Sequence, residues 1–421
     1  MRRKILATMT AVFIISAFYV INLNSRPEYS LITGNNCGNC HINPQGGGQR
    51  TYDGRYFRNQ TSLIGKKLGF FKNWNEAENS LDQYMLWGFD YRMQDAMLGT
   101  ERRLFSMQFT PYVSIMPTNW ATFSIQYNLI GLIHDALRDV NPNSDLKKFY
   151  YVGLYPGQKG LQTSVTFKPS KELPTLKVGY FQPAIGMRYD DHTMLNRQIY
   201  YTLPPILPPD NSELGAEVNY DYGLDLQLTG GVYGAKSMSE IAFYDKSSKK
   251  VPIVGSGSTS YLGKVVYSPR FAENLINTFV GASYLLNNDY SLINAFAGVG
   301  LTDYVSLSGE YVISNKKDLK KSNVIMAQLL FQPITAVNIY VRYENSVTQD
   351  HIVPAEIIEG QTPPDYSEFT NNKIVLGLGV FVIPNLELKP EYRMLSYKNN
   401  AGPNYVMDPS NEWALQLHLY Y

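Results

Sequence analysis

The residues with the most evident chemistry are five consecutive positions near the N-terminus, Cys37-Gly38-Asn39-Cys40-His41. Their pattern is C-x-x-C-H, the attachment signature of a c-type haem. Two thiols at this spacing each form a thioether with one vinyl group of the same porphyrin, and the imidazole of the next residue binds the iron axially. The chain contains 2 Cys, both in this motif, so haem attachment leaves no thiol over. The motif therefore predicts one covalently bound haem c, attached through Cys37 and Cys40 and ligated by His41.

Three other interpretations of the motif stay open. A C-x-x-C pair can be a redox disulfide, but no βαβ pattern surrounds this one. It can be half of a zinc site, but no second pair of Cys or His follows at zinc-finger spacing. It can also be a chance occurrence. The adjacent His41 and the predicted export of the chain favour haem.

The N-terminal residues predict export of the chain. Residues 2–4 are basic, residues 5–20 are largely apolar, and a polar break follows, which indicates a signal peptide over residues 1–25. A retained N-terminal anchor is the alternative, because no A-x-A cleavage site precedes Arg26. No other stretch approaches 18 uninterrupted apolar residues, so we expect no further membrane helix. The net charge of +1 gives no indication of a nucleic-acid partner.

Residues 26–80 predict a monohaem cytochrome c segment that is too short to enclose its own haem. About 50 residues bury a porphyrin poorly, and no Met or His follows His41 before Met85 to supply a second axial ligand. We therefore expect another part of the chain to complete the haem site. Arg50 and Arg55 are candidate partners of the haem propionates, with solvated arginines as the alternative. Three consecutive glycines after the motif allow close backbone approach to a flat ligand, or form a flexible turn.

Residues 81–421 alternate apolar and polar positions in runs of about 10, long enough to cross a bilayer when tilted. The polar positions carry both charges, as an aqueous lumen requires, and the 33 tyrosines suit interfacial aromatic girdles. The run over residues 412–421 ends on an aromatic residue, which resembles the assembly signal of bacterial outer-membrane proteins. A soluble sandwich with its apolar faces turned inward is the alternative.

The alternation predicts an all-β fold, a transmembrane antiparallel β-barrel of about 16 strands. About 17 candidate strands can be counted, but a single-chain barrel with both ends in the periplasm needs an even number. We place the miscount in the first 80 barrel residues, where the candidate strands are 83–92, 103–116, 119–132 and 148–155. The expected short turns are 302–303, 332–333 and 384–385, and the expected long loops are 314–322, 346–371 and 398–411.

The longest mid-chain loop, residues 183–212, lies outside by strand parity and is long enough to fold back into the lumen as a constriction. It contains His192 beside two carboxylates, and we take His192 as the first candidate for the second axial ligand of the haem. An exposed loop histidine, or a salt-bridge cluster that plugs the barrel, is the alternative, and a five-coordinate haem is also open. The remaining candidates have one of the two side chains that most often bind haem iron, methionine or histidine. They are Met85, Met93, Met97, His134 and lumen-facing His418.

A signal peptide, one C-x-x-C-H in a short segment and a β-barrel that ends on an aromatic residue together resemble the fused monohaem cytochrome–porins of bacterial outer membranes. This group includes the iron-oxidising cytochrome–porins. The resemblance covers the whole chain as architecture, and at residue level the region around residues 27–41 and the C-terminal strand. It implies that Cys37 and Cys40 hold the haem, that His41 binds its iron, and that the haem lies in or under the barrel mouth.

The resemblance further implies that one electron crosses the outer membrane through this haem, between an extracellular donor or acceptor and a periplasmic electron carrier. Fe(II) is one candidate donor. The first alternative is a solute-conducting porin whose haem segment acts as a plug or gate. A haem peroxidase is the second, and it needs a distal acid or base that only His192 offers. No Ser/His/Asp or paired-carboxylate constellation indicates a hydrolase or transferase.

Overall fold

The computed structural model describes residues 27–420 with gaps. The predicted signal peptide over residues 1–25 lies outside the described residues. The residues not described are 1–26, 34–36, 47, 52–53, 55–61, 64–79, 82–83, 99–100, 131–159, 171, 190–193, 196–210, 224, 245–249, 273–274, 302–303, 351–366, 400–409 and 421.

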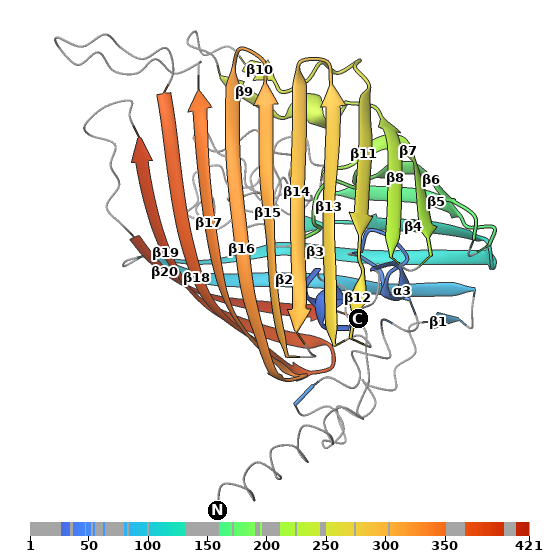
Figure 1. Cartoon of the computed structure of the whole chain (residues 1–421), viewed down its shortest axis with the longest axis horizontal. Coiled ribbons are helices and arrows are strands. Elements are labelled where there is room, and N and C mark those ends of the chain that lie inside the picture. The colour runs from blue at the N-terminus through green and yellow to red at the C-terminus, as the bar shows by residue number, and fades with distance from the viewer. Residues whose placement is uncertain are drawn as a thin grey trace, which may run out of the picture.

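A single large β-sheet dominates the fold and closes on itself (Figure 1). Within the described residues it has 18 strands, of which β1 (Ser80–Leu81) and β12 (Arg270–Phe271) are two residues long. The other 16 form the barrel. They are β2 (Met85–Leu98), β3 (Glu101–Thr118), β4 (Ala121–Tyr127), β5 (Leu161–Phe167), β6 (Thr175–Phe181), β7 (Glu213–Tyr222), β8 (Leu226–Tyr233), β11 (Ser260–Tyr267), β13 (Ile276–Asn287), β14 (Tyr290–Leu301), β15 (Val305–Lys316), β16 (Lys320–Ile334), β17 (Val337–Asp350), β18 (Ser367–Ile383), β19 (Leu386–Asn399) and β20 (Ser410–Tyr420).

Every neighbouring pair in the barrel is antiparallel, and the first and last strands close it through a register that runs from Asp90↔Tyr420 to Leu98↔Glu412. The predicted antiparallel barrel of about 16 strands is confirmed. The surplus candidate, residues 148–155, lies outside the described residues. The barrel closes without it because β4 pairs directly with β5, from Ala121↔Phe167 onward.

The alternation in the sequence separates a lipid-facing surface from a lumen. On β15, Leu307 and Tyr311 are exposed, whereas the intervening Ser308 and Glu310 are buried inside the barrel. Strand β20 repeats the pattern, with exposed Trp413 and Leu415 next to buried Ala414 and Gln416. Because the apolar side chains point away from the enclosed space, the soluble sandwich is excluded. The chain is a transmembrane β-barrel with a polar interior.

Aromatic side chains gather at the end of the barrel where the C-terminal strand finishes. Trp120 lies in the turn between β3 and β4 and stacks on Phe167, with ring centroids 6.2 Å apart. Tyr222, Tyr267 and Tyr304 are exposed at the same ends of their strands. These residues form part of an interfacial girdle, in which amphipathic rings sit at the level of the lipid headgroups.

Two expected turns differ from the structure for identifiable reasons. The long loop expected at 314–322 is a three-residue turn, because polar residues that looked like loop continue both strands and Lys316 pairs with Lys320. The turn expected at 332–333 is an irregularity within β16, where the register with β17 shifts between Phe331 and Ile334. Pro333 has no backbone N–H to donate, which fits such a break in the ladder. The short turn expected at 384–385 lies between β18 and β19. The turn at 302–303 and the greater part of the loops at 346–371 and 398–411 lie outside the described residues, and residues 346–350 and 367–371 belong to β17 and β18.

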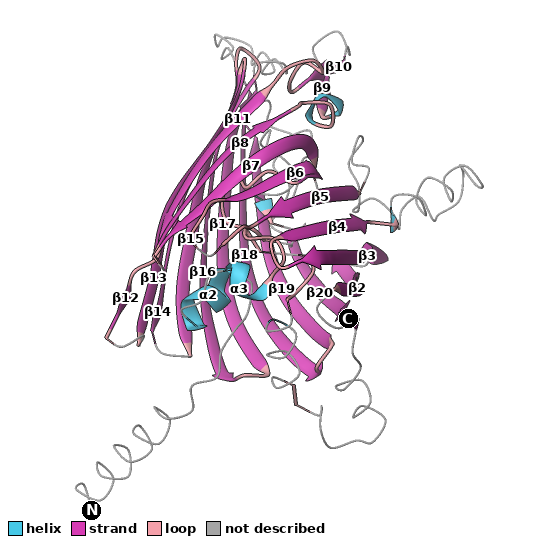
Figure 2. Cartoon of the chain, turned by 90° about the vertical axis from the view of Figure 1, so that its right-hand side faces the viewer, coloured by secondary structure: helices cyan, strands magenta, loops and turns pink. Residues whose placement is uncertain are grey.

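Two short helices lie within the ring of strands. These are α2 (Pro27–Thr33) and α3 (Cys37–Cys40), and Figure 2 shows them in the half of the barrel nearer the C-terminus. The described part of residues 27–51 therefore lies inside the barrel, whereas Ser80 belongs to β1 of the sheet. The division of a 26–80 segment from residues 81–421 stays a prediction. In the described part of the chain, no helix is both long and apolar enough to traverse a bilayer.

The opposite half of the lumen is filled by an apolar cluster. Inward loops bring the helical turn η2 (Met238–Glu240) and the pair β9 (Ala242–Tyr244) and β10 (Lys250–Pro252) against the barrel wall. Fully buried members such as Met238 and Ile253 contact wall residues. Described parts of the chain thus lie inside both halves of the barrel.

Candidate functional site in the barrel lumen

Helix α2 is seated on the inner wall of β13–β16 through two adjacent apolar side chains. Leu31 is 1% exposed and packs in a cluster with Phe279, Phe296 and Met326. Ile32 packs in a second cluster, with Leu330, Tyr340 and Val375. Full burial of two such side chains stabilises the seat by about 1.5–3 kcal/mol each.

Two glycines of β14 make room for this helix. A Cβ at Gly300 would lie 2.2 Å from the carbonyl oxygen of Leu31, and a Cβ at Gly298 would lie 2.7 Å from its Cδ1. Any larger residue at either position would displace the helix or the strand. The inner wall is therefore complementary in shape to α2, which indicates a specific contact between them.

The C-x-x-C-H motif forms a compact turn. Helix α3 carries both cysteines, and His41 donates its backbone N–H to the Cys37 carbonyl at 3.0 Å. Thr51 donates its backbone N–H to the Cys40 carbonyl at 2.9 Å, and His41 forms an isolated bridge with Arg50. The chain from residue 41 to 50 thus closes back on the motif. Gly54 lies directly against Cys40, where a Cβ would come within 2.3 Å of the Cys40 oxygen.

The polar residues after the motif bind the wall on several sides. Gln45 donates to Asn219 Oδ1 at 2.7 Å and accepts from Lys264 Nζ at 2.8 Å. On the other side of the lumen, Gln49 accepts a hydrogen bond from Ser114. The segment is held by β7, β11 and β3 together, so it crosses the lumen instead of lining one wall.

The glycines after the motif serve the turn and the wall. Gly46 and Gly48 have positive φ angles of 82° and 64°, which favour glycine. A Cβ at Gly48 would lie 2.9 Å from Gln126 Oε1 on β4. The backbone at Gly48 therefore lies close to the barrel wall, as the glycine at this position allows.

The two thiols differ in their surroundings. Cys40 is 1% exposed, whereas Cys37 borders a hollow of about 690 Å³, a volume that includes space open to solvent. The sulfurs form no disulfide with each other. Burial raises the pKa of the Cys37 thiol above its usual range, and the nearby positive charge of Lys264 acts in the opposite direction.

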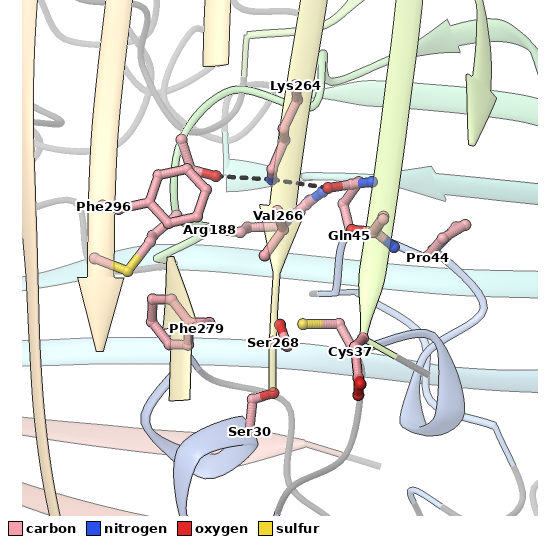
Figure 3. Close-up of a pocket in the computed structure, with 14 residues that line it drawn as sticks. Ser30, Cys37, Pro44, Gln45, Arg188, Lys264, Val266, Ser268, Phe279 and Phe296 are labelled. Carbon is pink, nitrogen blue, oxygen red and sulfur yellow. Dashed lines mark hydrogen bonds between the residues drawn. The ribbon is translucent and has the colours of Figure 1, made fainter. Parts of the chain in front are cut away.

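The hollow beside Cys37 is walled by three parts of the chain (Figure 3). The motif segment contributes Cys37 and Gln45, and strands β11, β13 and β14 contribute Lys264 together with aromatic side chains. The third part is the inward loop after β6, which contributes Met187 and Arg188. The Cys37 sulfur points into the space among these residues (Figure 3).

The loop after β6 folds back into the lumen, as its length predicted. Gly186 donates its backbone N–H to Ser283 Oγ at 2.8 Å, and Met187 donates its own to Glu310 Oε1 at 2.9 Å. Leu195 likewise donates its backbone N–H to Glu344. Wall side chains therefore hold residues 186–187 and 195 of this loop inside the barrel, and an internal constriction stays a prediction.

The donor set fits a haem c by its chemistry. Cysteines three positions apart project from the same side of one helical turn, and an imidazole follows directly. Cys37 and Cys40 would hold the group and His41 would ligate its iron, which stays a prediction. His41 is 3% exposed, and of the three residues only Cys37 borders the hollow. Within the described residues, no cluster of three or more His, Cys, Asp or Glu has the geometry of a metal site.

The other predicted ligand and propionate residues are distributed away from this hollow. Arg50 places its guanidinium 4.1 Å from the centre of the Tyr420 ring. Both ring nitrogens of His418 are engaged, Nε2 with Asp90 Oδ1 at 2.8 Å and Nδ1 with Glu387 Oε2 at 3.3 Å, which argues against His418 as a ligand. The positions outside the described residues are Arg55, His134 and His192.

The three methionines proposed on β2 are not lumen residues. Met93 alternates with Arg92 and Gln94, both of which are buried inside the barrel. Met97 is 44% exposed, and Met85 pairs with Ile115, which is itself exposed on the outer surface. These side chains face lipid, so the prediction that one of them binds the haem iron is wrong.

Sequence reasoning missed Met187, Arg188 and Lys264 as site residues. In the sequence, Lys264 is one of many polar positions in a predicted strand, and residues 187–188 belong to a predicted long loop. Only closure of the barrel and the inward path of the loop bring them beside Cys37. The length of the 183–212 loop was the one available signal.

No family model matches the chain, and no curated protein matches it. Solved structures with a similar fold include OprB of Pseudomonas putida, at 12% identity and TM-score 0.48, covering 86% of this chain and 98% of that one. The outer membrane protein OmpT of Vibrio cholerae aligns at 8% identity and TM-score 0.45, over 82% and 100%. The outer membrane channel DcaP of Acinetobacter baumannii aligns at 9% identity and TM-score 0.46, over 80% and 97%.

At these values the similarity is general, and the classification rests on the barrel itself. Sixteen antiparallel strands, a lipid-facing apolar surface, an aromatic girdle and a polar interior are the attributes of a single-chain outer-membrane barrel. The chain is an outer-membrane β-barrel with porin-like architecture. The exposed apolar side chains of its strands form the surface that faces the lipid of the outer membrane.

Proposed function

We propose that this protein is a porin-like channel of the outer membrane whose lumen is closed by its own C-x-x-C-H segment, acting as a plug or gate. Of the two functions expected from the sequence, this is the one that the barrel supports more directly. The observation that carries it is the seat of α2, where Gly298 and Gly300 leave space on the wall for Leu31.

The plug and the inward loop act together. Lys264 donates one hydrogen bond to Gln45 of the plug and another, at 2.9 Å, to the Gly186 carbonyl of the loop. A solute that crosses the barrel must pass this junction. Displacement of the plug is therefore expected to widen the path through the barrel. The inward loop is then expected to determine the width of the path that is left.

Single-channel recording in planar bilayers tests the proposal. The full chain is expected to conduct weakly, and deletion of residues 26–80 is expected to raise the conductance. Gly300→Leu should do the same without deletion, because its side chain competes with Leu31 for one space. Gly263→Leu is the matched control on exposed β11 surface, where a Cβ meets nothing within 4 Å. Equal conductance in all four folded proteins would contradict the plug.

A second function, one-electron transfer across the outer membrane, is favoured by the position of the motif in the lumen. Haem supplies one-electron redox chemistry when bound, with Cys37 and Cys40 as attachment residues and His41 as ligand. Buried surroundings of this kind tune a redox potential through polarity and hydrogen bonding. The partners would be an extracellular donor or acceptor, such as Fe(II) as donor, and a periplasmic electron carrier.

Absorbance of the purified protein separates the two functions. The second function requires a Soret band that survives denaturation, because the haem is covalent, and that disappears in Cys37→Ser/Cys40→Ser. It also requires reduction of that haem in sealed vesicles by an impermeant external reductant. A protein without Soret absorbance would leave the plugged channel as the function.

A further inference from the structure

Three cations lie around the motif segment, and none of them forms a salt bridge with a carboxylate among the described residues. Lys264 donates only to the neutral oxygens of Gln45 and Gly186. Lys177 donates to Asn43 Oδ1 at 3.4 Å and lies 4.3 Å from the centre of the Phe181 ring. Arg188 has a buried Nε with no hydrogen-bond partner in the described part of the chain.

The nearby carboxylates are already engaged elsewhere. Glu217 accepts hydrogen bonds from Asn219 and Tyr233, at 2.8 and 2.6 Å. Glu310 accepts from Asn294 at 3.0 Å and from the Met187 backbone. Asp225, which borders the hollow, lies 3.7 Å from Arg270. Glu217 and Glu310 keep their negative charges and offset the lysines from a distance, but no carboxylate among the described residues forms a salt bridge with Arg188, whose buried Nε has no partner there.

One part of the lining is apolar, while Ser30, Gln227 and Ser268 add neutral polar groups to it. Phe279 and Phe296 lie 6.1 Å apart between ring centroids, and both line the space together with Val266 and Met187. In Figure 3 the Phe279 and Phe296 rings lie on one side of the space and Lys264 lies above it. Such a combination suits a ligand with a planar apolar body and a negatively charged edge.

We propose that this hollow is a binding site for the carboxylate of a flat aromatic ligand, with Arg188 as its principal partner and Lys264 as its second. A guanidinium binds a carboxylate through two parallel hydrogen bonds, and it does so most strongly where water is excluded. The site rests on the proposed function, because the plug supplies one of its walls. Arg188, rather than Arg50, is then the cation that a bound ligand meets.

Two sources of this chemistry exist. One is a porphyrin held in the hollow, which presents propionates, and the other is a free aromatic carboxylate that enters the channel. Protoporphyrin IX and its dimethyl ester represent the first source, and the ester removes only the charges. Benzoate and neutral benzamide represent the second source in the same way.

Binding is measured by titration of the full mature chain, made in the cytoplasm without haem attachment and refolded in detergent. We expect at least one acid to bind, and its neutral counterpart to bind at least about tenfold more weakly, as loss of a charged hydrogen bond implies. Arg188→Gln should cause the same loss and Arg188→Lys should restore part of it. Arg50→Gln is the control and should bind like the native chain. Preference for the porphyrin or for benzoate identifies the source.

Acids and neutral analogues that bind equally would overturn the proposal, and so would failure of both acids to bind a folded chain. An equal effect of Arg50→Gln would overturn the assignment to Arg188. Conductance of the same samples keeps the proposed function separate. A plug that blocks conduction without binding either acid leaves the channel function standing and removes this site.

Discussion

On the lumen wall of β16–β20 each of several buried cations lies against a carboxylate, whereas beside Cys37 the cations lie against neutral oxygens and aromatic rings. Lys320 and Asp350 are 2.8 Å apart, and Arg342 and Glu344 are 2.7 Å apart, both pairs almost fully buried. Arg393 continues the row with Glu412 at 2.6 Å. No such pair involves Arg188 or Lys264 among the described residues.

The difference indicates two roles for charge within one lumen. Paired charges satisfy each other, so they hold the strands and the inward loop in register without attracting a ligand. Charges left without a counter-ion are costly to bury, and a protein retains them where a ligand supplies the missing partner. The paired wall is therefore structural, and the Cys37 side is where binding is expected.

The largest effect should follow from breaking the paired wall. Glu344→Leu leaves Arg342 and Lys373 without their shared carboxylate and removes the acceptor of the Leu195 N–H. We expect a loss of about 3–5 kcal/mol in unfolding free energy, as for other broken buried pairs. Urea titration in detergent micelles measures it. Asp95→Asn, which breaks an exposed pair with Arg102, should cost no more than about 1 kcal/mol.

A smaller effect should follow from removing Lys264. Lys264→Met deletes two hydrogen bonds from a charged donor, but it leaves no carboxylate unpaired, so we expect a loss of about 1–3 kcal/mol. The same titration measures it, and limited proteolysis should show faster cleavage of the motif segment. Lys321→Met, on the exposed face of β16, is the control. A loss as large as that of Glu344→Leu would remove the distinction between the two sides.

The smallest effect should come from Arg188→Gln. Arg188 makes no hydrogen bond or ion pair with the described residues, and its Nε is buried without a partner. Its removal should therefore leave the unfolding free energy unchanged or raise it, because the cost of burying an unpaired charge is relieved. On the paired wall, Arg342→Gln is the matched substitution and should lower the unfolding free energy, since it removes the nearer of the two cations beside the buried Glu344 carboxylate. Equal costs for the two substitutions would show that Arg188 is structural as well.

Much of the fold was accessible from the sequence because lipid on one side and a lumen on the other impose a period of two on every strand. The pattern failed where strands extend beyond the apolar band. Lys316 and Lys320 read as loop because they are polar, yet they are lumen-facing strand residues, and Lys320 lies opposite Asp350 on β17. Polarity alone does not distinguish a loop from a strand whose side chains face a polar interior.

The site was accessible only in part. The C-x-x-C-H spacing is local, so the sequence revealed it, and the shortness of its segment predicted support from the rest of the chain. The residues that border Cys37 come from positions about 150 and 230 further along, and their proximity depends on barrel closure. His192 was chosen as a candidate ligand because histidine commonly binds haem iron. Nothing in the sequence around Met187 and Arg188 indicates that these two residues lie beside Cys37.

The central claim is that the motif segment lies inside the barrel, and thiol cross-linking across the hollow tests it most directly. Ser268→Cys places a thiol on the wall opposite native Cys37, with Cys40→Ala to leave one thiol in the segment. A short bifunctional thiol reagent applied to intact outer membranes should link position 268 to Cys37, as identified by mass spectrometry of the joined peptides. The same reagent should give no link from the exposed control position in Ser256→Cys. A folded barrel that forms no link at position 268 would contradict the placement of the segment in the lumen.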